Sequence, residues 1–129
     1  MGDHPSHDVG YLLVARQALV DAIPHESWPQ EIDDFWCYLQ PRGHGGRVQE
    51  WKLHLPATPR SAEDVLARAV AVFARHRAPF RFAKDPRRLS DLLMIRDDRF
   101  ITAYPDDDDQ ARRLAHDLHL ATAELIGGL

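Results

Sequence analysis

A lysine and a histidine two residues apart have the types and spacing suited to acid–base chemistry. Lys52 and His54 stand in the run Trp51-Lys52-Leu53-His54, whose alternation is typical of a β-strand, so both polar side chains are expected on one face. A cation beside a group that titrates near neutral pH is an arrangement that general acid–base catalysis uses. Taken alone, the motif is weak, because such a pattern is more often a solvated strand face.

A second lysine follows an aromatic strand pattern. Lys84 comes directly after Phe80-Arg81-Phe82-Ala83 and directly before a turn, where a side chain can lean over a cleft. A lysine that is partly desolvated near other cations has a lowered pKa and can act as a general base. The alternative for Lys84 is a lysine at a strand end whose apolar stem lies along the surface.

Two polar residues bracket the next strand pattern, which covers residues 100–104. Arg99 precedes it and has the planar guanidinium that binds phosphate through two hydrogen bonds. Tyr104 ends it and offers a hydroxyl donor, and Arg96 is a further cation nearby. The alternatives are a surface arginine and a tyrosine packed beneath the last helix.

Helix and strand patterns alternate along the chain and would position these residues. Strands are expected over residues 35–39, 49–55, 79–84 and 100–104, and 25–33 is expected to be a loop. Helices are expected over residues 8–24, 61–76, a short stretch from 86, and 106–125. Asp8, Ser61 and Asp106 are predicted to cap three of them.

The apolar residues of these elements define an expected core. Trp51, Leu53 and Leu55 are expected on the buried face of their strand, and Phe80 with Phe82 on that of the next. The helices are expected to contribute Tyr11, Leu12, Ala15, Leu19, Ala22, Val65, Leu66, Ala69, Val72, Phe73, Leu89, Leu92, Leu93, Leu114, Leu118, Ala121 and Leu125. This order predicts an α+β fold, a small mainly antiparallel or mixed sheet with helices packed on one face.

Composition narrows the function classes. The chain has 129 residues and a formal net charge of −4, so a general basic field for nucleic acid is absent. No apolar run is long enough to cross a bilayer, the N-terminus does not resemble a signal peptide, and Cys37 is the single cysteine. We therefore expect a cytoplasmic protein without membrane contact, in which Cys37 is a buried strand residue. His116 and His119 are expected to be solvated, because a metal needs three or four convergent ligands.

Several segments, in order, resemble one protein family. DFWCYLQP, QEWKLHLPATPRSAEDVLARA, APFRFAKD and RFITAYPDDDDQARRLAHDLHLATAEL are similar to segments of the phosphoserine/phosphothreonine lyase domain at the N-terminus of class III and, above all, class IV lanthipeptide synthetases. The resemblance covers residues 34–125, preceded by an N-terminal helix and loop over 1–33, within a single domain over 1–129. It implies a fold similar to that of bacterial effector phosphothreonine lyases.

The resemblance also implies a reaction and its residues. Phosphate is eliminated from phosphoserine or phosphothreonine of a precursor peptide, which leaves dehydroalanine or dehydrobutyrine. Lys84 matches the base that removes the Cα proton, His54 the acid that protonates the leaving phosphate, and Lys52 the cation that stabilises charge on the carbonyl. Phosphate binding falls to Arg99, Tyr104 and Arg96. No metal or organic cofactor is implied, and the partners would be the phosphorylated precursor peptide and the kinase and cyclase domains or proteins of a synthetase.

The sequence departs from the family pattern in two places. Relatives carry a short glycine-containing insert where Arg99 and Phe100 are adjacent here, and they continue past the last helix with strands that add a phosphate-binding arginine, whereas this sequence ends at Leu129. We therefore expect slower elimination from this chain than from one with such a segment. The alternative function is a catalytically silent module that docks a precursor peptide or a kinase partner through the same cleft.

Overall fold

The fold consists of helices and strands that alternate along most of the chain. A computed structural model describes residues 6–43 and 51–126. The helices in these ranges are α1 (Ser6–Ala22), α2 (Ala62–His76), α3 (Pro86–Met94) and α4 (Asp108–Ile126). The strands are β1 (Gln30–Ile32), β2 (Trp36–Leu39), β3 (Leu53–Leu55), β4 (Phe80–Ala83) and β5 (Ile101–Ala103).

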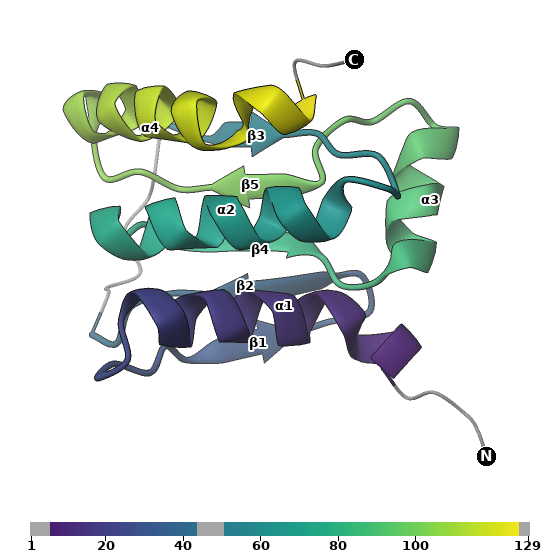
Figure 1. The fold of residues 1–129 in the computed structure, drawn as a ribbon, viewed down its shortest axis with the longest axis horizontal. Helices are drawn as coiled ribbons and strands as arrows, with labels where there is room; N and C mark the ends of the chain where they lie inside the picture. Colours follow the sequence, from purple (N-terminus) through teal and green to yellow (C-terminus); the bar gives the residue numbers. More distant parts are fainter. Residues whose placement is uncertain (1–5, 44–50, 127–129) are drawn as a thin grey trace.

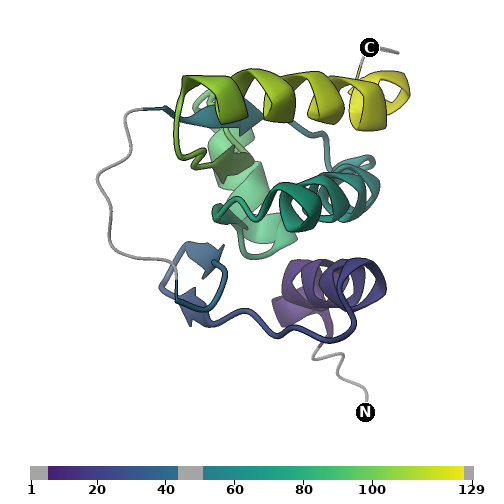
Figure 2. The ribbon, with the colours of Figure 1, turned by 90° about the vertical axis from the view of Figure 1, so that its left-hand side faces the viewer.

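The five strands form one antiparallel sheet in the order β1-β2-β4-β5-β3 (Figure 1). Helices α1, α2 and α4 run along one face of this sheet, and α3 crosses one end of it (Figure 1). The view from the side shows α1 and α2 as a layer separate from the strands (Figure 2). The predicted α+β class, with an antiparallel sheet and helices on one face, is confirmed.

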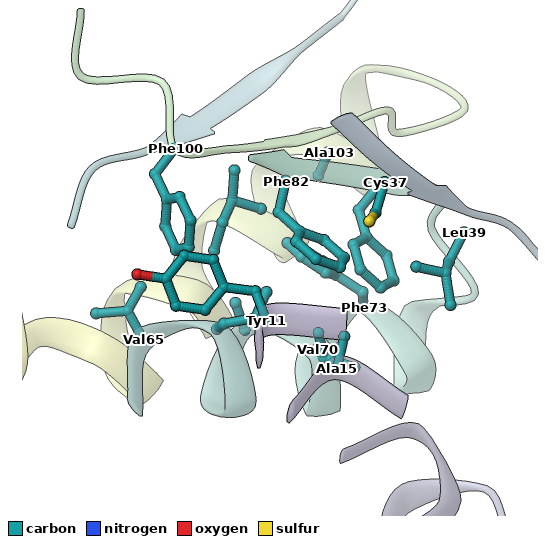
Figure 3. Close-up of a cluster of buried hydrophobic side chains, with 14 of the residues drawn as sticks. Tyr11, Ala15, Cys37, Leu39, Val65, Val70, Phe73, Phe82, Phe100 and Ala103 are labelled. Carbon is teal, nitrogen blue, oxygen red and sulfur yellow. The ribbon is translucent and has the colours of Figure 1, made fainter. Parts of the chain in front are cut away.

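The core lies between the sheet and α2, the central helix of that layer. Phe80 and Phe82 alternate with Arg81 along β4, so both rings lie on the helix side of the sheet. Figure 3 shows the ring of Phe82 in the buried cluster. Phe80 stacks on Phe73 of α2 at 4.8 Å between ring centroids, and Tyr11 of α1 meets Phe100 edge to face at 5.3 Å. Burying each such ring contributes about 1.5–3 kcal/mol, so this aromatic cluster fixes which face of the sheet is covered.

One strand is present where the sequence predicts a loop. β1 lies within residues 25–33, and its three side chains are all exposed. The backbone of β1 pairs with β2, and the guanidinium of Arg16 in α1 donates to the Gln30 side chain at 2.6 Å. Because hydrogen bonding along the backbone, rather than side-chain burial, holds this edge strand, no hydrophobic alternation marks it.

The strand predicted over residues 49–55 is shorter in the structure. Its described part that pairs is Leu53–Leu55, and residues 49 and 50 lie outside the described residues. The prediction that Trp51 belongs to the core is wrong, since 47% of this residue is exposed. Trp51 precedes the paired part of the strand, so the alternation that packs the partly buried Leu53 against the core no longer determines its position.

The helix starts differ from the predicted caps. Asp8 lies inside α1, and Ser61 precedes α2 without a side-chain cap, because its hydroxyl is hydrogen-bonded to Thr58 at 3.0 Å instead. At α4 the capping residue is Asp107, which accepts from the backbone N–H of Gln110 at 2.8 Å. Four consecutive aspartates offered several equivalent caps, and the prediction chose one residue too early.

Two residues expected in the core are exposed. Ala22 ends α1 on the surface, and Leu93 of α3 is 40% exposed, whereas Leu89 and Leu92 are buried as predicted. A nine-residue helix that crosses the end of a sheet touches the core with a narrow stripe only. This accounts for the solvent contact of Leu93.

Helix α3 ends with an arginine in a conformation that favours glycine. Arg96 has φ +60°, its N–H donates to the Leu93 carbonyl at 3.0 Å, and the N–H of Asp97 donates to the Leu92 carbonyl at 2.9 Å. This pair of bonds is the motif that most often places glycine at such a helix end. The turn delivers the chain to Arg99 at the start of β5.

Replacing Arg96 with glycine should raise the free energy of unfolding by about 0.5–1 kcal/mol, because the left-handed conformation is costly for a residue with a Cβ atom. Arg87, an exposed residue inside α3, is the matched control, and Arg87→Gly should lower the free energy of unfolding by about 0.5–1 kcal/mol. Urea denaturation of the three proteins measures both changes. Equal destabilisation by the two substitutions would contradict the role given to the turn.

Candidate functional site

The sheet face opposite the helices carries a row of side chains from all five strands. The register aligns Tyr38 with Arg81, Arg81 with Thr102, and Thr102 with His54, and Glu31 of β1 pairs with Tyr38. Directly paired residues of antiparallel strands share a face. Since Phe80 and Phe82 face the helices, this row lies on the other side, here called the open face.

His54 is oriented by its neighbour on β5. Its Nδ1 is hydrogen-bonded to the hydroxyl of Thr102 at 3.0 Å, and Thr102 is completely buried. The bond uses one ring nitrogen, so Nε2 is the nitrogen available to a substrate on the open face. A buried hydroxyl that holds the ring in one orientation is typical of a positioned acid–base group.

Cations surround this histidine. Partial burial lowers the pKa of His54, and the positive charges of Arg99, Arg81 and Lys52 lower it further, while Asp97 acts in the opposite direction. We call Lys52, Arg81 and Arg99 the cation cluster. At neutral pH the imidazole is therefore neutral, and the cluster offers positive charge to an anion.

Inorganic phosphate should raise the pKa of His54, because a dianion held by the cation cluster favours the imidazolium form. Binding near neutral pH should then be accompanied by proton uptake. An NMR titration of the histidine ring signals with and without phosphate measures the change, and the ring signals of the exposed His116 should not respond to phosphate. A lowered or unchanged pKa for His54 would show that phosphate binds elsewhere.

Arg99 is held by an acidic neighbour. Its Nε and a terminal nitrogen donate to the two carboxylate oxygens of Asp97 at 2.9 and 2.7 Å, and its backbone N–H donates to the same carboxylate at 3.0 Å. These bonds lower the pKa of Asp97 to about 2 and raise the pKa of Arg99. The Arg99 side chain is still 51% exposed, so a phosphate can approach it but must compete with Asp97.

Tyr104 and Lys52 flank the row at one end of the sheet. The backbone N–H of Tyr104 donates to the Pro79 carbonyl at 2.9 Å, which continues the β4–β5 pairing and gives its side chain the face of Thr102. Burial raises the pKa of Tyr104 while Arg81 opposes the rise, so the hydroxyl stays protonated and can donate. The same register places the exposed Lys52 opposite Tyr104.

Lys84 lies at the opposite end of β4 from Tyr104. The N–H of Lys84 donates to the Phe35 carbonyl at 3.0 Å, and its Nζ donates to the Asp33 carbonyl at 3.1 Å. Alternation after Phe82 gives Lys84 the helix side of the sheet, at its margin. Lys52 and Arg99 thus both act on His54, whereas Lys84 lies beside the turn that contains Asp33.

Arg96 is exposed in the turn after α3, three residues before Arg99. Its place at the same end of β5 as Arg99 makes it a peripheral cation rather than a member of the row. Lys52, by contrast, is one of the charges that act on His54. Of the predicted phosphate-binding residues, Arg99 is therefore the one whose charge lowers the pKa of His54 most.

Sequence reasoning missed Arg81, the central residue of the row. Its guanidinium lies 4.0 Å from the ring centroid of Trp36, a contact that fixes a cation over an aromatic face. Its Nε is buried and has no hydrogen-bond partner among residues 6–43 and 51–126. The signal was present in the sequence, because Arg81 alternates with two phenylalanines and therefore shares the face opposite the core.

Other chemistry finds little support in the described part of the chain. No group of three or more histidine, cysteine, aspartate or glutamate side chains within it is arranged to hold a metal, and His116 and His119 are exposed. Cys37 is a buried residue of β2 as predicted, and burial raises the pKa of its thiol to about 11, which leaves it unreactive. None of the described helices combines the length and apolar character that a membrane span requires.

Comparison with protein-family models identifies one match, which is described as RamC, N-terminal domain, and covers residues 16–128. Comparison with curated proteins gave no match. RamC is a class III-like synthetase, and the matched family is related to lanthipeptides. Because the matched region takes in every described strand, the helices α2, α3 and α4, and the last part of α1, the chain belongs to the RamC N-terminal domain family.

Proposed function

We propose that this domain is a lyase that eliminates phosphate from phosphoserine or phosphothreonine in a precursor peptide during lanthipeptide biosynthesis. The products would be dehydroalanine or dehydrobutyrine in the peptide and free phosphate. The observation that carries the proposal is His54, positioned by Thr102 and subject to the charges of the cation cluster, on the face of the sheet away from the described helices. A dianionic phosphate ester fits this combination of charge and proton donor.

The elimination needs a base, an acid, a cation near the peptide carbonyl and a phosphate site, and each function has a candidate residue. A base takes the Cα proton, the electron pair forms the Cα–Cβ double bond, and the Cβ–O bond breaks as the phosphate leaves. His54 would protonate the leaving oxygen, since the bound dianion itself raises the pKa of the imidazole. Lys52 would stabilise the negative charge that develops on the peptide carbonyl, and Arg99 with Tyr104 would hold the phosphate.

Lys84 is the proposed base, and this role has a structural requirement. The Nζ of Lys84 donates to the Asp33 carbonyl at the end of the sheet, so it must leave that carbonyl and reach around the end of β4 to the substrate Cα atom. It must also be deprotonated to take the Cα proton. Arg96 would add positive charge at the periphery of the phosphate site.

The proposed reaction implies which cofactors, partners and compartment the domain would need. The reaction as written involves only protein side chains and the substrate, so no metal or organic cofactor is needed. The partners would be a phosphorylated precursor peptide and the kinase and cyclase domains or proteins that act before and after elimination. The reaction would take place in the cytoplasm, without contact with nucleic acid or a membrane.

Mass spectrometry of a phosphorylated precursor peptide after incubation tests the proposal directly. Elimination removes the elements of phosphoric acid and leaves an electrophilic double bond that a small added thiol traps. Hydrolysis would return the unmodified hydroxyl residue, which no thiol traps. A peptide that stays phosphorylated in the presence of folded protein would refute the lyase function.

A silent docking module is the second candidate, and two contacts favour it. Arg99 is paired with Asp97 in the free protein, and Lys84 is bound to a backbone carbonyl away from the row of His54. Such a module would bind the phosphorylated peptide without consuming it. Saturable binding by calorimetry together with an unchanged peptide mass would identify this function.

A further inference from the structure

Strand β3 is an edge of the sheet, and His54 is its central residue. β5 pairs with one side of β3, and no strand pairs with the other side among residues 6–43 and 51–126. An edge strand offers backbone donors and acceptors that an extended peptide can use. The edge in question is thus the one next to the cation cluster.

The hydrogen-bonding pattern shows which residue of β3 directs its backbone outward. The N–H of Tyr104 and the carbonyl of Phe100 both bond to the β4 side, at 2.9 and 3.1 Å. Backbone direction alternates along a strand, so Ile101 and Ala103 direct their groups toward β3, where they face Leu55 and Leu53. The N–H and carbonyl of His54 therefore point away from the sheet.

A groove runs beside this edge on the helix side. It has a volume of about 320 Å³ and separates β3 from α4. The α4 residues that line it recur with helical spacing and are mostly small or apolar: Ala115, Leu118, His119, Thr122 and Ala123. The hydroxyl of Thr122 donates to the Leu118 carbonyl at 2.7 Å, so its polar atom is satisfied within the helix.

We infer that the phosphorylated peptide docks as an additional antiparallel strand on β3, with the phosphorylated residue opposite His54; this inference rests on the proposed function. It describes the docked complex, in which the peptide lies three strand spacings, about 14 Å, from β4. The peptide must therefore shift toward β4 before Lys84 can reach its Cα atom. A residue opposite His54 in a hydrogen-bonded pair exchanges both backbone bonds with it. Its side chain shares the open face, with Cβ atoms about 4.5–5.5 Å apart. The phosphate then lies beside the imidazole, in the region where the charges of Lys52 and Arg99 act on His54, whereas the guanidinium of Arg81 is turned toward Trp36 of β2.

The same geometry determines what surrounds the phosphorylated residue. Its two sequence neighbours face Leu53 and Leu55, so their side chains point to the opposite face and enter the groove against α4. The groove is narrow and mainly apolar, so it accepts small apolar side chains and excludes charged ones. Sequence preference thus arises from the residues adjacent to the phosphorylated position.

Backbone methylation of the peptide tests the strand geometry. The probe is a peptide with a phosphonate in place of the phosphate ester, which cannot be eliminated. A methyl group on the nitrogen of the phosphonate residue removes the N–H that bonds to the His54 carbonyl, and binding should weaken about tenfold or more. A methyl group on the next nitrogen, which points away from β3, is the matched control and should change binding by less than about threefold.

Two measurements on the protein complete the test. The N–H of His54 should exchange more slowly with solvent when the phosphonate peptide is bound. Ala115→Leu narrows the groove and should weaken binding of that peptide, whereas His116→Leu, next to it but outside the groove, should not. Neither substitution should change the affinity for inorganic phosphate.

The outcomes separate this inference from the proposed function. Elimination without protection of the His54 amide, or with equal effects of the two methyl groups, would overturn the added strand and leave the lyase function standing. If the His54 amide is protected and only the first methyl group weakens binding, but no phosphate is eliminated, the lyase function is overturned and the added strand stands. Protection of the same amide in the free protein that grows with concentration would assign the edge to a second copy and overturn the inference.

Discussion

Replacing His54 with glutamine should lower the rate of phosphate elimination by about 10²–10⁴-fold, the usual effect of removing a general acid. Glutamine keeps a polar group beside the buried hydroxyl of Thr102, so the fold should survive, but it cannot deliver a proton to the leaving phosphate. Single-turnover assays on one phosphopeptide, followed by mass spectrometry, measure the rate.

The matched control for this variant is His116→Gln, which changes an exposed histidine on α4. It should eliminate phosphate at the wild-type rate. Circular dichroism of both variants verifies folding. Wild-type elimination by folded His54→Gln would remove His54 from the chemistry and favour the docking module.

Replacing Lys84 with methionine should lower the rate of elimination by about 10²–10⁴-fold while changing the affinity for phosphopeptide only slightly. Methionine keeps the length and the apolar stem but has no amine to take the Cα proton. The phosphate would still be held by the cation cluster on the open face, so binding and turnover should separate. Calorimetry gives the affinity and the peptide assay gives the rate.

Lys84→Arg distinguishes a base from a structural cation. Arginine can still donate to the Asp33 carbonyl, but it does not lose its proton in proteins. If Lys84 acts as the base, the arginine variant should be as slow as the methionine variant. If it only fixes the turn at Asp33, arginine should restore most of the activity, and the base must then be sought elsewhere.

The sequence predicted the buried side of the sheet because chemistry and geometry agree there. Phe80 and Phe82 alternate with a charged residue, and the helix α2 that covers them repeats Val65, Leu66, Ala69 and Phe73 at helical spacing. Burial of large apolar groups dominates the free energy of folding, so such patterns predict the buried face of the sheet directly. The shared face of Lys52 and His54 follows from the same alternation, whereas the position of Arg99 does not, because Arg99 precedes β5.

The features that the sequence could not show depend on contacts between residues that are far apart in the chain. β1 has only exposed side chains and is recognisable solely by its backbone partner β2. The contact of Arg81 with Trp36 and the bond between His54 and Thr102 join residues that are far apart in the sequence. Local patterns give the face on which a side chain lies but not the neighbour that it meets there.

The ion pair between Arg99 and Asp97 bears on how binding at this site responds to ionic strength. In most anion sites, an arginine exchanges small counterions from solution for its ligand, and affinity falls as salt is added. Here the group that leaves Arg99 is a carboxylate two residues away, whose local concentration the salt does not change. Arg99 should therefore contribute little to the salt dependence of phosphopeptide affinity, most of which should come from the exposed Lys52.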